Sequence, residues 1–304
     1  MIVDRMAADL GLKAGFIHSF ARGASHAYKT YPIPKRGGGS REIDHPSRQL
    51  KAMQRWLLEY VLPGFPVHRA AAAYRKGRSI LDNAAIHAAS RFLLRMDCEK
   101  FFPSITEADF RRYISDRPSL FADWTPFDVD VVSMIVFKYS HLTIGAPTSP
   151  AISNILCFDM DSALTDLAVR YGAMYSRYAD DLFFSTQRPN ILRPLQIEVE
   201  KTVSQLELPA GLTINASKTR HSSKRRLRRV TGIVLGSDGD PHIGRSLKRR
   251  IRSLIHRVDS LNPRARAQLA GLLAYAIGLD SGFLNSLIMK YGYGTVAKAR
   301  RAGG

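Results

Sequence analysis

The stretch Tyr178-Ala179-Asp180-Asp181 decides how the rest of this sequence is interpreted. It places two adjacent carboxylates between two short extended runs, Met174–Arg177 and Leu182–Phe184, which predict the strands of a hairpin. Adjacent Asp side chains at a hairpin tip repel one another unless a cation lies between them. Two Mg²⁺ ions would supply that charge, and paired metals stabilise the attacking and leaving oxygens of a displacement at phosphorus. The alternative is an ordinary solvated turn, because Asp is a common turn residue.

The composition indicates a polyanionic partner. The chain has 304 residues, 45% of them apolar, and can bury the core of one large or two medium domains. Its 45 Lys and Arg against 26 Asp and Glu give a net charge of +19, which favours nucleic acid as the partner. A membrane is the competing explanation, but the longest apolar stretches, such as Ala270–Leu279, are shorter than the roughly 20 residues of a bilayer span. Charged residues interrupt the N-terminus, unlike a secretory signal, so we expect a cytoplasmic protein with no membrane partner.

Other common reaction classes lack their motifs here. The two cysteines, Cys98 and Cys157, lie neither in a CxxC pair nor at zinc-finger spacing from a His. The sequence contains no GxxxxGK[ST] loop, no GxSxG elbow and no HExxH helix. The motifs that remain favour chemistry carried out by metal ions and carboxylates.

The pattern of apolar residues predicts alternating strands and helices. A glycine turn joins two short cationic runs into a predicted hairpin, and a buried strand is predicted to end in Asp97. The predicted strands are residues 31–36, 40–43 and 92–97, and the predicted helices are 50–62, two within 108–139 around Pro118 and Pro126, 150–168 and 243–258. This succession predicts the α+β class.

The sequence becomes strongly basic after about Arg220. Residues 224–229 hold five cations in six positions, and residues 243–304 hold twelve Lys and Arg against two Asp. The helix predicted over 243–258 carries an apolar stripe, and its other faces carry Arg245, Lys248, Arg249, Arg250, Arg252 and Arg257. A solvated surface usually mixes both signs of charge, so we interpret this helical module as a contact surface for backbone phosphates.

Asp97 differs from an ordinary strand-end Asp because an aromatic residue, Phe102, follows five positions later. If Asp97 meets Asp180 and Asp181 on neighbouring strands, three carboxylates can bind two Mg²⁺ ions. Such a site can deprotonate a primer hydroxyl and take charge from the leaving pyrophosphate. The predicted reaction is nucleotidyl transfer.

These residues follow the order and approximate spacing of the palm motifs of reverse transcriptases, and the chain resembles that family. The motifs are Asp97 with Phe102, Gly145-Ala146-Pro147-Thr148-Ser149-Pro150, Tyr178-Ala179-Asp180-Asp181, and Gly211-Leu212-Thr213-Ile214-Asn215 with Lys218. Two further elements resemble the retron branch, with Asn83-Ala84-Ala85-Ile86-His87 matching its NAxxH element and Val230-Thr231-Gly232 its VTG element. The resemblance extends from about Ile33 to His256.

The resemblance implies a right-hand polymerase of the α+β class. Such an enzyme has fingers, a palm whose antiparallel sheet packs on helices, and an α-helical thumb. We expect interleaved fingers and palm in residues 1–236 and the basic helical thumb in residues 237–304. The helix over 243–258 would track the departing duplex, with nucleic-acid contacts from Arg245, Lys248, Arg249 and Arg252.

The resemblance also implies a role for each motif residue. Asp97, Asp180 and Asp181 would be the ligands of two Mg²⁺ ions, and the backbone carbonyl of Cys98 would complete one coordination shell. Lys218 would protonate the leaving pyrophosphate, a role that needs a cation close to the developing charge.

The incoming nucleotide would be bound by several of these motifs. Lys35 and Arg41 would hold its triphosphate, unless they only form a solvated hairpin. Phe102 would exclude a 2′-hydroxyl beneath the sugar, although it could also serve core packing. Further nucleotide contacts would come from Gly145, Ala146 and Pro147.

One family position has a different residue in this chain, and two others have an alternative structural role. Ile144 stands where the family commonly has Gln before Gly145, which puts fidelity, processivity or template preference in doubt because its side chain cannot form that hydrogen bond. His87 has an alternative as a hydrogen-bonded structural histidine, and Gly232 as a tight-turn residue.

The resemblance implies a retron RNA-directed DNA polymerase. It would copy part of a structured noncoding RNA from its own locus, using dNTPs, into single-stranded DNA that stays linked to the RNA. Retrons are antiphage defence systems, so a separately encoded effector protein is expected, and no room is expected after the thumb for an RNase H domain. The alternatives are a group II intron-like, diversity-generating or abortive-infection reverse transcriptase, or a non-catalytic RNA-binding scaffold.

Overall fold

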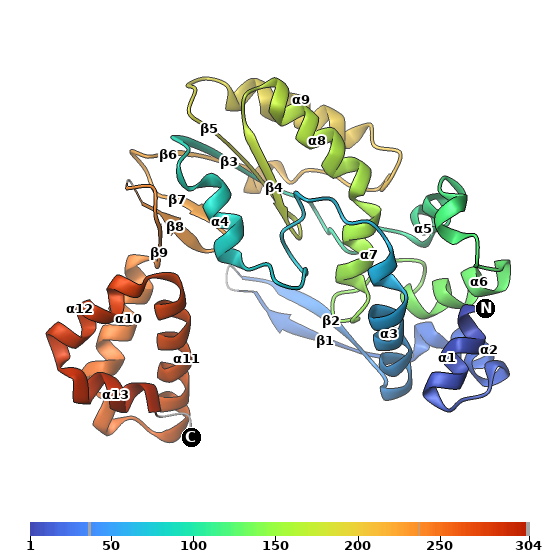
Figure 1. Ribbon diagram of the computed structural model, residues 1–304, viewed down its shortest axis with the longest axis horizontal. Helices are drawn as coiled ribbons and strands as arrows, with labels where there is room; N and C mark the ends of the chain where they lie inside the picture. The colour runs from blue at the N-terminus through green and yellow to red at the C-terminus, as the bar shows by residue number, and fades with distance from the viewer. Residues whose placement is uncertain (36–37, 237, 302–304) are drawn as a thin grey trace. The chain divides into compact units, whose positions relative to one another are not determined.

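The computed structural model describes residues 1–35, 38–236 and 238–301 (Figure 1). Arg36 and Gly37, which belong to the predicted glycine turn, lie outside the described residues. The chain divides into two compact units, which are treated separately below. The first comprises residues 1–76, 94–184 and 190–220, and the second comprises residues 77–93, 185–189 and 221–304.

A four-stranded sheet carries the predicted catalytic segments. Its strand order is β4-β5-β3-β6, with β3 at Phe92–Asp97, β4 at Met174–Tyr178, β5 at Asp181–Thr186 and β6 at Arg220–Ser223. A loop of two residues joins β4 to β5, and Ala179 in this loop has a positive φ of 57°. The predicted hairpin and the predicted strand that ends in Asp97 are therefore confirmed.

Four further helices belong to this part of the first unit. These are α5 at Glu107–Ser115, α7 at Ser149–Leu156, α8 at Phe158–Arg170 and α9 at Leu192–Ser204, and α8 contacts both β4 and α9 (Figure 1). The prediction of one helix over residues 150–168 is wrong, because the chain leaves helical geometry at Cys157, with ψ at 9°. The apolar stripe continues through the break with every member buried, so periodicity alone did not reveal it.

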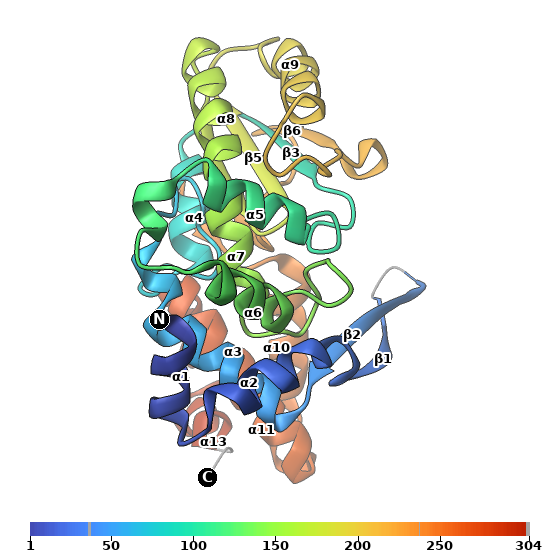
Figure 2. The ribbon, with the colours of Figure 1, turned by 90° about the vertical axis from the view of Figure 1, so that its right-hand side faces the viewer.

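The N-terminal part of the first unit consists of a β-hairpin and four helices. Strands β1, Tyr28–Pro34, and β2, Ser40–Pro46, pair antiparallel, and both views show them as an extended arm (Figure 1, Figure 2). Nearby lie α1 at Ile2–Leu10, α2 at Ala14–Arg22, α3 at Arg48–Tyr60 and α6 at Pro126–Val136. The Ser47 hydroxyl accepts from the Leu50 N–H and begins α3, which confirms the predicted hairpin and helix.

The second unit combines a small sheet with a helical bundle. Helix α4, Ile80–Ala88, packs on the antiparallel sheet of β7, Arg228–Val230, β8, Ile233–Leu235, and β9, Pro241–His242. The bundle consists of α10 at Arg245–His256, α11 at Pro263–Leu279, α12 at Ser281–Tyr291 and α13 at Tyr293–Arg301. Its core includes Ile251, Ile255, Leu269, Leu273, Phe283 and Leu287. The predicted basic helix is α10, with its apolar stripe facing this core.

Short 3₁₀ turns complete the described structure. They are η1 at Ala24–His26, η2 at Leu62–Gly64, η3 at Pro118–Phe121, η4 at Ala216–Lys218 and η5 at Val258–Ser260. Across the part of the chain that the structure describes, every helix is too short or too polar to cross a lipid bilayer.

A fully buried ion pair anchors the strand that leads into the two-residue loop. The Arg177 guanidinium on β4 donates to both carboxylate oxygens of Asp161 on α8, at 2.7–3.1 Å, and both side chains are 0% exposed. The Tyr175 hydroxyl also donates to Asp161 (2.8 Å). Helix α8 begins directly after the break at Cys157 and carries Asp161 in its first turn.

We expect Asp161→Asn to lower the free energy of unfolding by about 3–5 kcal/mol, because it leaves a buried guanidinium without its counter-charge. Urea unfolding of the purified protein measures this loss. Asp159→Asn is the matched control, since Asp159 pairs with Arg117 near the surface, where an ion pair contributes at most about 1 kcal/mol. Equal losses in the two variants would contradict the anchoring role.

Candidate active site

Three carboxylates meet where β3 ends and β5 begins. Asp97 is the last residue of β3, Asp181 is the first residue of β5, and Asp180 lies in the loop before it. The backbone N–H of Cys98 donates to the carbonyl oxygen of Asp180 at 2.8 Å. Because the two strands are neighbours in the sheet, this bond holds the three predicted Asp residues at one sheet edge.

A third segment is bonded to the end of β3. The N–H of Glu99 donates to the carbonyl of Thr213, and the N–H of Asn215 donates to the carbonyl of Asp97, both at 2.8 Å. These bonds bring η4 to the site, where Lys218 Nζ donates to both carboxylate oxygens of Asp97, at 2.8 and 3.0 Å. The predicted catalytic residues Asp97, Asp180, Asp181 and Lys218 are thus brought together.

Asp181 has a cationic partner that the sequence interpretation missed. Arg95 on β3 donates from Nε and Nη2 to the two carboxylate oxygens of Asp181, at 2.8–2.9 Å. The signal that could have found it is the two-residue period of a strand, since Arg95 and Asp97 lie on the same face of β3.

Two of these carboxylates have raised pKa values. The pKa of Asp181 is raised to about 6, first by burial, with smaller increases from Asp180 and Asp97 and a decrease from Arg95. The pKa of Asp180 is also raised, first by burial and then by Asp97, against the lowering effects of Lys218 and Arg41. The resident cations therefore do not fully offset the negative charge.

The donor set suits a hard divalent cation. Carboxylate oxygens are the ligands that Mg²⁺ prefers, and their raised pKa values indicate that added positive charge would be favourable. Within the described residues, no group of three or more His, Cys, Asp or Glu side chains is already arranged as a metal cage. Lys218 and Arg95 engage Asp97 and Asp181 instead. The Cys98 thiol is buried and burial holds its pKa well above the usual range, so only the backbone carbonyl of Cys98 suits the predicted ligand role.

An aromatic pair lies beside the carboxylates. The ring of Phe102 is 6.3 Å from that of Tyr74, centroid to centroid, and 5.5 Å from that of Phe101. Tyr74 is 51% exposed with φ at 61°, an uncommon backbone conformation for an aromatic residue. Its pKa is raised by burial and then by Asp180, and lowered by Arg41, so these charges lie within electrostatic reach of its hydroxyl. No motif or spacing in the sequence singles out Tyr74.

The Gly145 loop is held against β2. The N–H of Asp44 donates to the carbonyl of Ile144 at 2.8 Å, and a Cβ on Gly145 would lie 2.5 Å from the carbonyl oxygen of Asp44. With φ at 122° as well, only glycine fits this position. Ala146 is buried and Pro147 half-buried beyond it, and Ile144 takes part through its backbone.

The two cations predicted on the β1–β2 hairpin differ in their surroundings. Both side chains are exposed. Arg41 on β2 lowers the pKa of Asp180, so it lies within electrostatic range of the carboxylates. Lys35 follows β1, and its backbone N–H donates to the carbonyl of Gly39 at 3.0 Å.

The NAxxH and VTG elements belong to one packed part of the second unit. Asn83 and His87 on α4 are fully buried, and His87 Nδ1 lies 2.8 Å from the hydroxyl of Ser185. Burial lowers the pKa of His87 to about 3, so it stays neutral. Thr231 and Gly232, with φ at 47° and 87°, form the two-residue loop between β7 and β8. The histidine is thus hydrogen-bonded inside the unit and the glycine lies in a tight turn.

The β7–β8 hairpin holds both ends of α4. Val230 ends β7, and the hydroxyl of Thr231, next along the chain, donates to the carbonyl of Ile80 at the start of α4 (3.3 Å). The buried Arg228 guanidinium donates to the carbonyls of Ala88 (3.1 Å) and Ser90 at the end of the helix. The two elements are therefore parts of a single structural piece.

The predicted nucleic-acid contacts on α10 divide into two pairs. Arg245 and Arg249 are exposed. Lys248 donates to the carboxylate of Asp280 at 2.7 Å, and Arg252 lies over the ring of Phe283 at 5.5 Å from its centroid. Two of the four cations are thus engaged inside the bundle.

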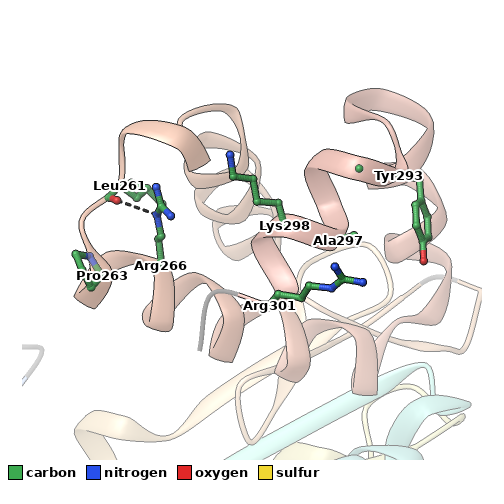
Figure 3. Close-up of a pocket in the computed structure, with 8 residues that line it drawn as sticks. Leu261, Pro263, Arg266, Tyr293, Ala297, Lys298 and Arg301 are labelled. Atoms are coloured by element: carbon green, nitrogen blue, oxygen red, sulfur yellow. Dashed lines mark hydrogen bonds between the residues drawn. The ribbon is translucent and has the colours of Figure 1, made fainter. Parts of the chain in front are cut away.

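The same bundle has a basic pocket that the sequence interpretation did not identify. It has a volume of about 860 Å³ (Figure 3). The close-up shows its three cations, Arg266 on α11 and Lys298 and Arg301 on α13, together with Tyr293. Arg266 Nε donates to the carbonyl of Leu261 at 2.9 Å, which fixes this guanidinium at one end of the pocket.

Comparison with known proteins gives consistent matches. The model of the reverse transcriptase (RNA-dependent DNA polymerase) family matches residues 33–235. The retron Ec83 reverse transcriptase of Escherichia coli is 34% identical over 292 residues, covering 92% of this chain and 92% of that protein. The retron Mx162 reverse transcriptase of Myxococcus xanthus is 33% identical, covering 90% of this chain and 62% of its own length.

Solved structures agree on the fold. The apo telomerase of Candida tropicalis superposes with a TM-score of 0.53 at 12% identity, covering 93% of this chain and 63% of that one. At this identity the likeness concerns the fold alone, and it confirms the predicted α+β right-hand polymerase class.

The metal-free protein should lose stability as the pH rises through the pKa of Asp181. The pKa of about 6 in the folded state lies above the ordinary value of 3.8, so the proton stabilises the fold. This stability is complete below pH 3.8 and is lost as the pH rises through about 6. Asp181 should account for a fall of about 1.4 kcal/mol between pH 5 and 7.5, and urea unfolding in EDTA should show that Asp181→Asn removes it.

Asp130→Asn is the control for this measurement, because Asp130 is an exposed carboxylate that also pairs with an arginine, Arg111. It should leave the pH dependence of the wild type unchanged. If the free energy of unfolding depends on pH in the same way for the wild type and Asp181→Asn, the raised pKa of Asp181 is contradicted.

Proposed function

This chain belongs to the reverse transcriptase family and, within it, to the retron reverse transcriptases, and from that premise we propose how its residues carry out DNA synthesis. The chain is an RNA-directed DNA polymerase, and the family implies dependence on a divalent metal. The observation that carries the proposal is the meeting of Asp97, Asp180 and Asp181 at one edge of the sheet.

Two Mg²⁺ ions would be held by Asp97, Asp180 and Asp181 with the backbone carbonyl of Cys98. When bound, they supply Lewis acidity at the primer hydroxyl and neutralise charge on the leaving pyrophosphate. Lys218 would protonate the pyrophosphate, a role supported by the 2.8 Å distance from its Nζ to Asp97.

The incoming dNTP would bind between the hairpin and the carboxylates. Arg41 and Lys35 would hold its triphosphate, and the electrostatic coupling of Arg41 to Asp180 supports this for Arg41. The loop Gly145-Ala146-Pro147 would lie along the nucleotide. Phe102 would lie beneath the sugar, with Tyr74 packed beside it.

The template would be a structured noncoding RNA from the same locus. The product would be single-stranded DNA that remains linked to this RNA, and a separately encoded effector protein would complete an antiphage defence complex. RNA and dNTPs meet in the cytoplasm, which we propose as the location. We propose that residues 1–236 form the fingers and palm and that residues 237–304 form the thumb.

The sequence alone left two other functions open, and membership of the retron reverse transcriptases argues against both. Another class of bacterial reverse transcriptase would share the chemistry and differ in template, and a non-catalytic scaffold would bind RNA without copying it. The joined NAxxH and VTG piece supports the retron assignment. Sequencing the nucleic acid that copurifies with the chain distinguishes them, since only a retron enzyme should yield one RNA joined to a DNA copy of part of itself.

Primer extension with Mg²⁺ tests the catalytic proposal. Asp180→Asn should reduce the rate by roughly a hundredfold or more, because one ligand of the metals is lost. Chelation with EDTA should abolish extension. The variant Asp130→Asn changes an exposed carboxylate of the same unit and should extend the primer at the wild-type rate. Extension by Asp180→Asn at that rate would contradict the proposal.

Phe102→Ala should admit ribonucleotides, because the ring no longer fills the space of a 2′-hydroxyl. We expect kcat/KM for a ribonucleotide, relative to its deoxynucleotide, to rise roughly 10- to 100-fold in single-nucleotide incorporation. Phe16→Ala on α2, where the ring is 46% exposed, is the control and should leave the ratio unchanged. An unchanged ratio in Phe102→Ala would exclude the steric role.

The exposed cations of α10 should contribute to duplex binding through phosphates. Replacing Arg245 and Arg249 together by Ala should reduce the slope of log affinity against log salt by about 2, at roughly 0.9 per contact. Fluorescence anisotropy with an RNA–DNA duplex measures the slope. Arg193→Ala with Lys201→Ala on α9 is the control pair. A slope equal to that of the wild type would remove α10 from the binding surface.

A further inference from the structure

The contact between Arg95 and Asp181 uses both oxygens that a metal ion would need. Arg95 Nε and Nη2 donate to Oδ1 at 2.9 and 2.8 Å, and Nη2 also donates to Oδ2 at 2.9 Å. A guanidinium that grips a carboxylate in this way satisfies it more completely than an ammonium can. A divalent cation that binds these oxygens therefore competes with the guanidinium for them.

The ion pair between Arg95 and Asp181 contributes little to the stability of the fold. The Arg95 side chain is 45% exposed, and exposed ion pairs contribute at most about 1 kcal/mol. The buried pair of Arg177 and Asp161, 0% exposed, anchors the same hairpin already. A different role for Arg95 follows from the charges that surround Asp181.

Three carboxylates at one sheet edge repel one another when no metal is bound. Lys218 offsets Asp97, and Arg95 offsets Asp181, so each outer carboxylate has one cation of its own. Among the residues that the structure describes, Asp180 makes no ion pair. The two cations thus offset Asp97 and Asp181, while Asp180 has no such partner among the described residues.

We propose that Arg95 is a resident counter-ion, which holds the Asp181 carboxylate until a divalent metal displaces it and so sets the metal concentration at which the site fills. This inference rests on the proposed role of Asp181 as a metal ligand. The half-exposed Arg95 side chain can turn toward solvent when displaced, so the exchange needs no movement of β3.

Direct measurement of Mn²⁺ binding tests the proposal. The full-length chain, free of nucleic acid, is titrated with Mn²⁺ and the free ion is followed by electron paramagnetic resonance. Arg95→Gln keeps the length and polarity of the side chain but removes its charge. We expect its Kd for Mn²⁺ to fall about two- to fivefold, because the metal no longer competes with an ion pair.

Arg111→Gln is the matched control. Arg111 is 43% exposed and pairs with the carboxylates of Glu107 and Asp130, away from the site. Its Kd for Mn²⁺ should equal that of the wild type, and thermal unfolding in EDTA should show both variants folded. An Arg95→Gln chain that binds Mn²⁺ no more tightly than Arg111→Gln would overturn the counter-ion role.

A double-mutant cycle locates the effect at Asp181. Asp181→Asn should weaken Mn²⁺ binding, and adding Arg95→Gln to it should change the Kd no further. A tightening that persists in the double variant would overturn the proposal, since it would not act through Asp181. If Asp181→Asn alone binds Mn²⁺ like the wild type, the ligand role of Asp181 fails as well. Weaker binding by Asp181→Asn without tighter binding by Arg95→Gln refutes only the counter-ion role.

Discussion

Repulsion among three carboxylates at one sheet edge is the constraint on which the rest of this structure depends. Asp97, Asp180 and Asp181 are held together by backbone hydrogen bonds, which do not relax when charges repel. The pKa values of Asp180 and Asp181 are raised, first by burial and to a smaller extent by the neighbouring carboxylates. Lys218 and Arg95 offset part of this negative charge, and the expected metal ions would offset more.

Local patterns in the sequence predicted the main elements and the centre of the site. The strand that ends in Asp97, the Asp180-Asp181 hairpin and the cationic β1–β2 arm each follow from short-range periodicity and turn residues. The break at Cys157 could not be predicted, because the apolar stripe passes through it unchanged. The helix that restarts after the break carries Asp161, whose partner Arg177 lies on a strand further along the chain.

Partners that come from distant parts of the chain were also beyond local patterns. Arg95 lies 86 residues from Asp181, and the two-residue period of β3 places it on the face of Asp97 without showing that Asp181 is its partner. Tyr74 reaches Phe102 through a loop with an uncommon backbone conformation. The charge composition predicted that α10 is basic. It could not predict that Lys248 pairs with Asp280 inside the bundle. Which cations face solvent is decided by tertiary packing.

Anomalous diffraction from crystals of this chain soaked in Mn²⁺ tests the central claim most directly. If the three carboxylates bind divalent metal, we expect anomalous density within roughly 2 Å of carboxylate oxygens of Asp97, Asp180 and Asp181. The Arg95 guanidinium should then be turned away from Asp181. Mn²⁺ bound only elsewhere, with Arg95 still gripping Asp181 at saturating metal, would contradict it.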